Sequence, residues 1–172
     1  MGGASLNCIN FVVPMNPCKC GFYPDKNRCR CSEPELRKYW NRLSGPLLDR
    51  MDMYVETSRI ELEKLQTLGQ GESSAQIRRR VMEARTIQEE RFRGRPYSFN
   101  GDMDSRELER FCELGEEEKR LMELAYRRLD LSARTYHRVL KVARTIADLG
   151  HSERIREEHL SEALAYRFTE RA

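Results

Sequence analysis

The 172-residue chain lacks several features that would place it in a familiar class. It has no apolar run near the roughly 20 residues of a membrane-spanning helix. Its first residues, MGGASLNC, have neither the basic start nor the apolar stretch of a secretory signal. The net charge is only +3, so global charge does not argue for nucleic acid as a partner. These absences predict a cytoplasmic protein with no membrane partner.

Two nucleotide-binding motifs are also missing. The sequence contains no G-x-x-x-x-G-K-[ST] stretch to cradle phosphates, and no apolar strand ending in Asp-Glu to hold magnesium. The three histidines are scattered and do not have the spacing of metal ligands. We therefore expect this chain, on its own, neither to bind ATP tightly nor to hydrolyse it.

Four of the six cysteines lie in two tight pairs, Cys18-Lys-Cys20 and Cys29-Arg-Cys31. A Cys-x-Cys pair can place two thiolates on one metal, and a compact loop lets four converge tetrahedrally. The absence of a secretory signal favours metal binding or free thiols over disulfides. The spacing predicts a structural Zn²⁺ site formed by Cys18, Cys20, Cys29 and Cys31. A reduced loop without metal and a disulfide-bonded loop are the alternatives.

The hydrophobic pattern of the first half predicts two strands and two helices. The apolar run Ile9–Val13 is typical of a buried strand, and the alternation over Met51–Val55 predicts a second strand. Ser32 and Glu35 have the spacing of a capping box, which predicts a helix start. A second such box precedes a long helix expected over residues 74–92.

From Asp104 onward, periodic apolar stripes and short loops predict a small helical bundle. Asp104 and Glu107 are expected to cap the first helix of this bundle, Ser132 to cap the third helix and Gly150 to end it. The expected fold is therefore mixed: a partial α/β core remnant with two strands, short helices and a cysteine loop, followed by an all-α bundle. We expect three regions: a core remnant over 1–56, a connector with a long basic helix over 57–102, and the bundle over 103–172.

Three motifs in this order resemble the magnesium-chelatase-like AAA+ ATPases, close to the ComM/YifB family. The apolar run leads to Asn16, and the run GPLLDR ends in Arg50. The stretch LSARTYHRVLKVARTIADL contains Arg134. The resemblance covers residues from about Asn7 to Phe168. It implies the C-terminal portion of an AAA+ module, without the phosphate-binding first half, and it makes the bundle the helical lid.

The resemblance also implies roles for these three residues. Asn16 would sense the γ-phosphate as sensor 1, Arg50 would act in trans as an arginine finger, and Arg134 would contact an ATP phosphate as sensor 2. Considered alone, an Asn before a proline is more often a turn residue, and Arg50 beside Asp49 would be a surface ion pair.

As a whole, the resemblance implies a homo-oligomeric ring, expected to be a hexamer when full length, that uses ATP and Mg²⁺. In the ComM-like branch the motor is a DNA helicase that moves branch points during DNA uptake and recombination. In the chelatase branch it drives magnesium insertion into a porphyrin. The cysteine loop favours the ComM-like branch. A stand-alone zinc-and-helix interaction module is a third hypothesis.

The long helix carries an excess of positive charge. Residues 76–96 contain seven arginines and three glutamates. Arg78, Arg79 and Arg80 are candidates for contact with a nucleic-acid backbone, because phosphate contacts supply most non-specific affinity. A merely solvated charged face is the alternative.

Overall fold

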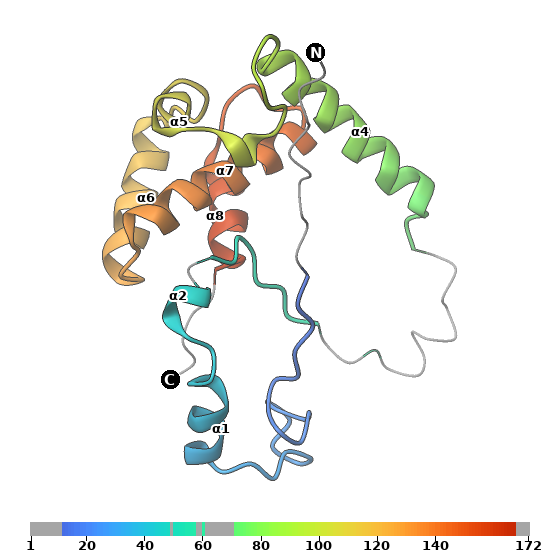
Figure 1. The fold of residues 1–172 in the computed structure, drawn as a ribbon, viewed down its shortest axis with the longest axis vertical. Helices are drawn as coiled ribbons and strands as arrows, with labels where there is room; N and C mark the ends of the chain where they lie inside the picture. Colours follow the sequence, from blue (N-terminus) through green and yellow to red (C-terminus); the bar gives the residue numbers. More distant parts are fainter. Residues whose placement is uncertain (1–11, 49, 58–59, 61–70, 168–172) are drawn as a thin grey trace. The chain divides into compact units, whose positions relative to one another are not determined.

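The computed structural model describes residues 12–48, 50–57, 60 and 71–167 (Figure 1). The chain divides into two compact units, and the division falls after Leu47. In the described ranges, the regular elements are seven α-helices and one 3₁₀ helix. None of the helices found in those ranges is both long and apolar enough to cross a membrane.

The first unit consists of the cysteine loop and α1 (Glu33–Trp40), followed by the start of α2 (Gly45–Leu48). The predicted capping box is confirmed: the Ser32 backbone N–H donates to Glu35 Oε2 at 3.0 Å, and Pro34 lies in the first turn. The Tyr39 hydroxyl donates to the Asn16 carbonyl at 2.9 Å, which ties α1 back to the start of the loop.

The prediction of two strands is wrong for the described residues. Val12 and Val13 are exposed and outside any ladder, while residues 9–11 lie outside the described ranges. Residues 51–57 form no ladder either, because the Tyr54 N–H donates instead to the carbonyl of Tyr166, at 2.8 Å. A strand needs a neighbouring strand to satisfy its backbone groups, and here the end of a helix takes that place. The described part is all-helical, so the mixed α/β class is corrected.

The second unit begins its regular structure with α4 (Ser74–Arg91) and η1 (Asn100–Asp102). The bundle helices follow as α5 (Ser105–Phe111), α6 (Glu116–Arg128), α7 (Ala133–Leu149) and α8 (Glu157–Ala165). The predicted caps at Ser73, Asp104 and Ser132 are confirmed, since each side chain accepts a hydrogen bond from the backbone N–H three residues later. Gly150 follows α7 directly, as expected.

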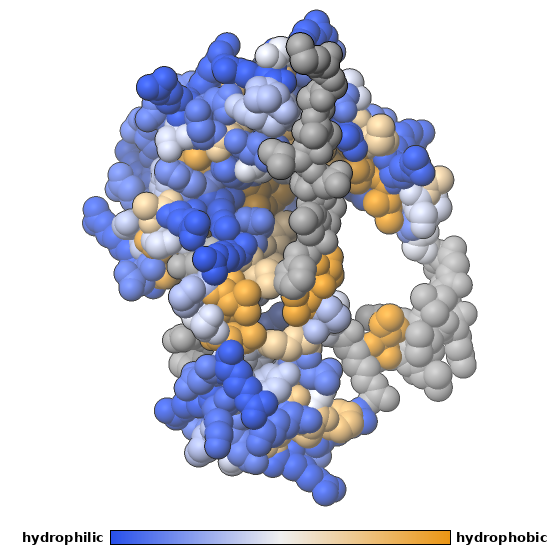
Figure 2. Space-filling model, viewed as in Figure 1, coloured by the Kyte–Doolittle hydropathy of each residue, from blue (hydrophilic) through white to orange (hydrophobic). Residues whose placement is uncertain are grey.

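Helix α7 is the centre of the second unit (Figure 1). It packs against α8, α4, η1 and α5, and its residues Val139, Leu140, Ala143 and Ala147 are buried. The core around them is completed by side chains from the other elements: Phe92, Met103, Leu108, Cys112, Leu114, Met122, Ala125, Leu131, Ile155, Leu160 and Ala163. Figure 2 shows that the visible face of this unit is largely hydrophilic, with apolar side chains in separate patches.

A buried charge network joins α4 to α7. The Asp148 side chain is 0% exposed and accepts hydrogen bonds from Arg91 Nη1 at 2.6 Å, Asn100 Nδ2 at 2.8 Å and Arg144 Nε at 3.1 Å. Arg144 also donates to the carbonyls of Ser152 and Glu153, beyond α7. Buried charges persist only when paired and hydrogen-bonded, so this network fixes the two helices against each other.

Candidate metal centre and nucleotide-facing residues

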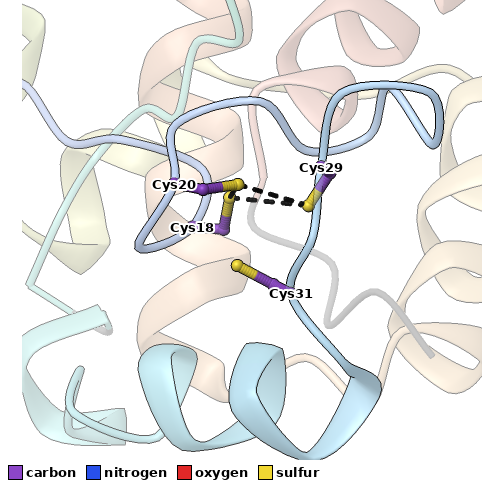
Figure 3. A group of neighbouring side chains, drawn as sticks. All are labelled: Cys18, Cys20, Cys29 and Cys31. Atoms are coloured by element: carbon purple, nitrogen blue, oxygen red, sulfur yellow. Dashed lines mark hydrogen bonds between the residues drawn. The ribbon is translucent and has the colours of Figure 1, made fainter.

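The structure brings together the four cysteines predicted to bind zinc (Figure 3). The Sγ atoms of Cys18 and Cys20 lie 3.2 Å apart, and Cys29 Sγ lies 3.8 Å from the first and 3.6 Å from the second. With Cys31, all four sulfurs lie within 4.8 Å of one another.

These distances fit a tetrahedral thiolate site. Zinc–sulfur bonds of about 2.3 Å place the sulfurs of a regular tetrahedron roughly 3.8 Å apart. All four cysteines are free, and no other ligand type joins the cluster among the described residues. Four sulfurs without an open position are typical of a structural Zn²⁺ site, so we assign this one no catalysis.

Two tight turns bring the cysteine pairs to this arrangement. Gly21 donates its N–H to the Cys18 carbonyl at 3.1 Å and has φ of +79°, a conformation that glycine adopts without strain. The second pair follows a turn in which the Asp25 carbonyl accepts the N–H of Cys29 at 2.7 Å. Cys31 then directly precedes Ser32, the N-cap of α1, so the sulfur cluster and the helix start are coupled through the chain.

The first cysteine pair is set up to ionise. The backbone N–H of Phe22 is the main cause that lowers the pKa of Cys20 to about 6, helped by the Cys18 thiol. Burial opposes ionisation of Cys18, yet hydrogen bonds from the amides of Tyr23, Phe22 and Cys20 lower its pKa overall. Within this pair, Cys20 is therefore the thiol that ionises most readily.

The second pair is held protonated by the first. A hydrogen bond from the Cys31 amide favours the Cys29 thiolate, but burial and the sulfurs of Cys20 and Cys18 outweigh it and raise the pKa of Cys29 to about 12. The pKa of Cys31 is raised as well: the Cys20 amide favours its thiolate, and burial and the first pair oppose it. Like charges this close ionise together only when a cation neutralises them, and a divalent metal does so.

The sulfur cluster is the buried centre of the described part of the first unit. In the described part of that unit, Cys18 is the one buried apolar residue, at 0% exposure, while α1 has no buried residue. Val12, Val13 and Phe22 are each exposed by more than 40%. A metal bound by the four sulfurs would hold the two turns of the loop and the start of α1 together.

The three residues predicted to contact a nucleotide are all exposed. Asn16 is in the loop before the first cysteine, and its carbonyl is held by the Tyr39 hydroxyl. Arg50 follows α2 in a turn, and its neighbour Asp49 lies outside the described residues. Arg134 is in the first turn of α7. Their roles as sensor 1, arginine finger and sensor 2 stay predictions.

Arg134 lines a cleft of about 770 Å³ in the second unit, together with Arg138 and Lys141. Arg138 Nε lies 3.0 Å from Asp52 Oδ1, and Lys141 Nζ donates to the Gly101 carbonyl at 2.8 Å. A cation at the start of a helix meets the positive end of the helix dipole. The start of α7 and Arg134 would both attract an anion, while the acids Asp52 and Glu162 line the same cleft.

The basic face of α4 is smaller than the sequence indicated. Arg78 and Arg79 are exposed, whereas Arg80 pairs with Glu72 at 2.7 Å. Arg91 belongs to the buried network and cannot reach a phosphate. The sequence motifs assign no role to Arg144 or to Asp148, the centre of that network. Their spacing of four residues on α7 is the sequence feature that predicts an ion pair between them.

Two family models match the chain, one in each half. The model described as "Magnesium chelatase, subunit ChlI C-terminal" matches residues 71–167, and the model described as "Magnesium chelatase, subunit ChlI" matches residues 7–65. Together they include the cysteine cluster, Asn16 and Arg50 in the first half, and Arg134 in the second.

Curated relatives match nearly all of the chain. It is 44% identical to the competence protein ComM of Haemophilus influenzae over 160 residues, which is 92% of this chain and 30% of that protein. It is 42% identical to the uncharacterized protein YifB of Escherichia coli over 164 residues, 95% of this chain and 31% of that protein. The chain thus spans under a third of the length of these two relatives.

Proposed function

Because this chain belongs to the magnesium chelatase subunit ChlI family, whose C-terminal model covers more than half of it, we propose that it forms the sensor, arginine-finger and lid part of an ATP-driven ring motor that acts on DNA. The observation that carries the proposal is the 44% identity to the competence protein ComM over 92% of the chain. The ring, the hexameric state and the DNA substrate all belong to the proposal.

In this motor, bound ATP with Mg²⁺ supplies the phosphoryl group whose transfer drives movement. Arg50 would place its guanidinium against the nucleotide of a neighbouring subunit and neutralise the charge that spreads over the phosphoryl oxygens. Its exposed position in a turn supports this role, because such a side chain can reach another subunit. Asn16 would act within its own subunit's site.

Arg134 would hold a phosphate at the start of α7. The helix start and the guanidinium are both positive and repel each other. This repulsion is relieved when an anion binds between them. The four cysteines would hold Zn²⁺ and fix the loop that follows Asn16. The metal's role is to position that loop.

The chelatase function is the second candidate, and the name of the matching family favours it. The cysteine cluster favours the ComM-like function, because a four-sulfur site stabilises structure and offers no open position for a metal that must be passed to a porphyrin.

A chimera tests the proposal. Residues 7–167 of this chain would replace the matched portion of the Haemophilus influenzae competence protein, and ATP hydrolysis would be measured alone, with branched DNA, and with a porphyrin and Mg²⁺. We expect hydrolysis that branched DNA stimulates and porphyrin does not. A folded chimera that does not hydrolyse ATP, or one that responds only to porphyrin, would contradict the proposal.

A further inference from the structure

A second cleft of about 590 Å³ lies where α6 ends and α7 begins. The residues that line it are Glu123, Tyr126, Arg127, Ala133, Tyr136 and His137. They come from the last turns of α6 and the first turns of α7, both within the second unit (Figure 1). The sequence motifs assign no role to this cleft.

Aromatic rings form one part of its wall. The rings of Tyr126 and Tyr136 have centroids 6.2 Å apart and meet edge to face at 76°. Tyr136 also packs against the His137 ring, with centroids 6.0 Å apart. Tyr126 is 43% exposed, although Met122 and Ala125 on the same helix are buried. The chain thus leaves part of the Tyr126 ring in contact with water at a cleft, and a planar base can stack on an exposed aromatic ring.

Positive charge continues from this cleft into the neighbouring one. Arg127 lines the first cleft, the His137 ring lines both, and three cations of α7, Arg134, Arg138 and Lys141, line the second beside the acids Asp52 and Glu162. The four residues on α7 follow at helical spacing, so they share one face over a length of about 10 Å. The N-terminus of α7 adds its own positive partial charge. Glu123 is the one acid among the residues that line the first cleft.

We propose that this surface binds single-stranded nucleic acid, with an unpaired base stacked on Tyr126 and adjacent phosphates held by Arg127 and by Arg138 and Lys141 of α7, while Arg134 is left to the nucleotide. Stacking on Tyr126 requires a base that is not paired, which excludes an intact duplex. The charge extends across two clefts, which fits successive phosphates along a strand. This inference rests on the proposed function, because it names the part of the DNA substrate that the lid would hold.

Equilibrium binding of a fluorescein-labelled dT₁₂ oligonucleotide to the zinc-loaded 172-residue chain, without ATP, tests the proposal. We expect Tyr126→Ala to weaken binding about tenfold, in line with the loss of one stacked base, and Tyr126→Phe to bind like the wild type. Arg127→Ala should reduce the slope of affinity against salt by about one phosphate contact. Glu123→Gln should tighten binding, because it removes the acid from the lining.

Two controls separate this surface from the rest of the chain. Leu124→Ala, on the same helix and 48% exposed but outside the cleft lining, should leave binding unchanged. Replacing Arg78, Arg79 and Arg80 together should lower affinity by less than Tyr126→Ala does. Circular dichroism of each variant checks that the helices are retained.

Several results would overturn the inference. One is that the wild type does not bind the oligonucleotide. A second is that Tyr126→Ala and Arg127→Ala both bind it within twofold of the wild type. The third is that millimolar ATP fully displaces the oligonucleotide. The last result would mean that the surface takes a free nucleotide. The binding assay uses neither ATP hydrolysis nor the chimera. A chimera that fails to act as a motor therefore does not change the result expected in the binding assay.

Discussion

Replacing Asp148 should strongly destabilise the second unit. Its carboxylate compensates two guanidinium groups, those of Arg91 and Arg144, whose side chains are only 12% and 3% exposed. Asp148→Ala leaves both cations without their shared carboxylate, and it removes an acceptor from Asn100 as well.

The expected cost follows from that loss. Breaking a buried ion pair by removing one partner typically costs about 3–5 kcal/mol, because the remaining charge stays buried. A domain of this size has a total stability of roughly 5–15 kcal/mol, so the variant would lose a large part of it. Asp148→Asn keeps the shape and one acceptor oxygen, and we expect it to cost less than Asp148→Ala.

Urea unfolding followed by circular dichroism at 222 nm measures this effect, since α4 to α8 supply most of the helical signal. The matched control is Glu109→Ala, an exposed acid on α5, which should change the free energy of unfolding by less than about 0.5 kcal/mol. If Asp148→Ala cost less than about 1 kcal/mol, the network would not hold α4 against α7 and our reasoning would be refuted.

Three further predictions concern the metal site and the core. The purified chain should carry about one Zn²⁺ per molecule. Removing the metal with a chelator should change the fluorescence of Trp40, the chain's single tryptophan, while the circular dichroism signal at 222 nm is largely kept. Well under half an equivalent of metal in reduced protein would contradict this prediction. Gly21→Ala should weaken metal binding because φ there is +79°, with strain of roughly 1–2 kcal/mol, whereas Gly71→Ala, at an open position without a positive φ, should not. Leu140→Ala, at a 5% exposed core position, should cost roughly 2–5 kcal/mol in urea unfolding, and Leu149→Ala, 38% exposed, much less; equal costs would show that Leu140 is not in the core.

Much of the fold could be predicted from local signals. The capping boxes at Ser32, Ser73 and Asp104 start helices where the sequence indicated, because these caps involve residues only three apart. The cysteine cluster was also predictable, because four thiols in two close pairs have only three possible states: bound to a metal, joined by disulfides, or reduced and free. The resemblance to the ComM/YifB family is confirmed by the comparisons.

What failed depended on distant partners. An apolar or alternating stretch indicates a strand only if another strand lies beside it, and the N–H of Tyr54 instead finds a carbonyl at the end of α8. The pairing of Arg91 with Asp148 joins residues 57 positions apart, so no local pattern distinguishes Arg91 from the exposed arginines of α4. The Tyr126–Tyr136 cleft likewise arises from the packing of two helices.

The central claim, that this chain supplies the arginine finger and lid of a ring motor, is tested most directly by mixing subunits. In the chimera with the competence protein, Arg50→Ala should lower ATP turnover on the order of 10³-fold, whereas the exposed Arg42→Ala should have little effect. Mixing Arg50→Ala subunits with subunits whose phosphate-binding lysine is replaced should restore part of the turnover, because one kind keeps the phosphate cradle and the other keeps the finger. Turnover of Arg50→Ala within about twofold of the unmodified chimera would contradict the account.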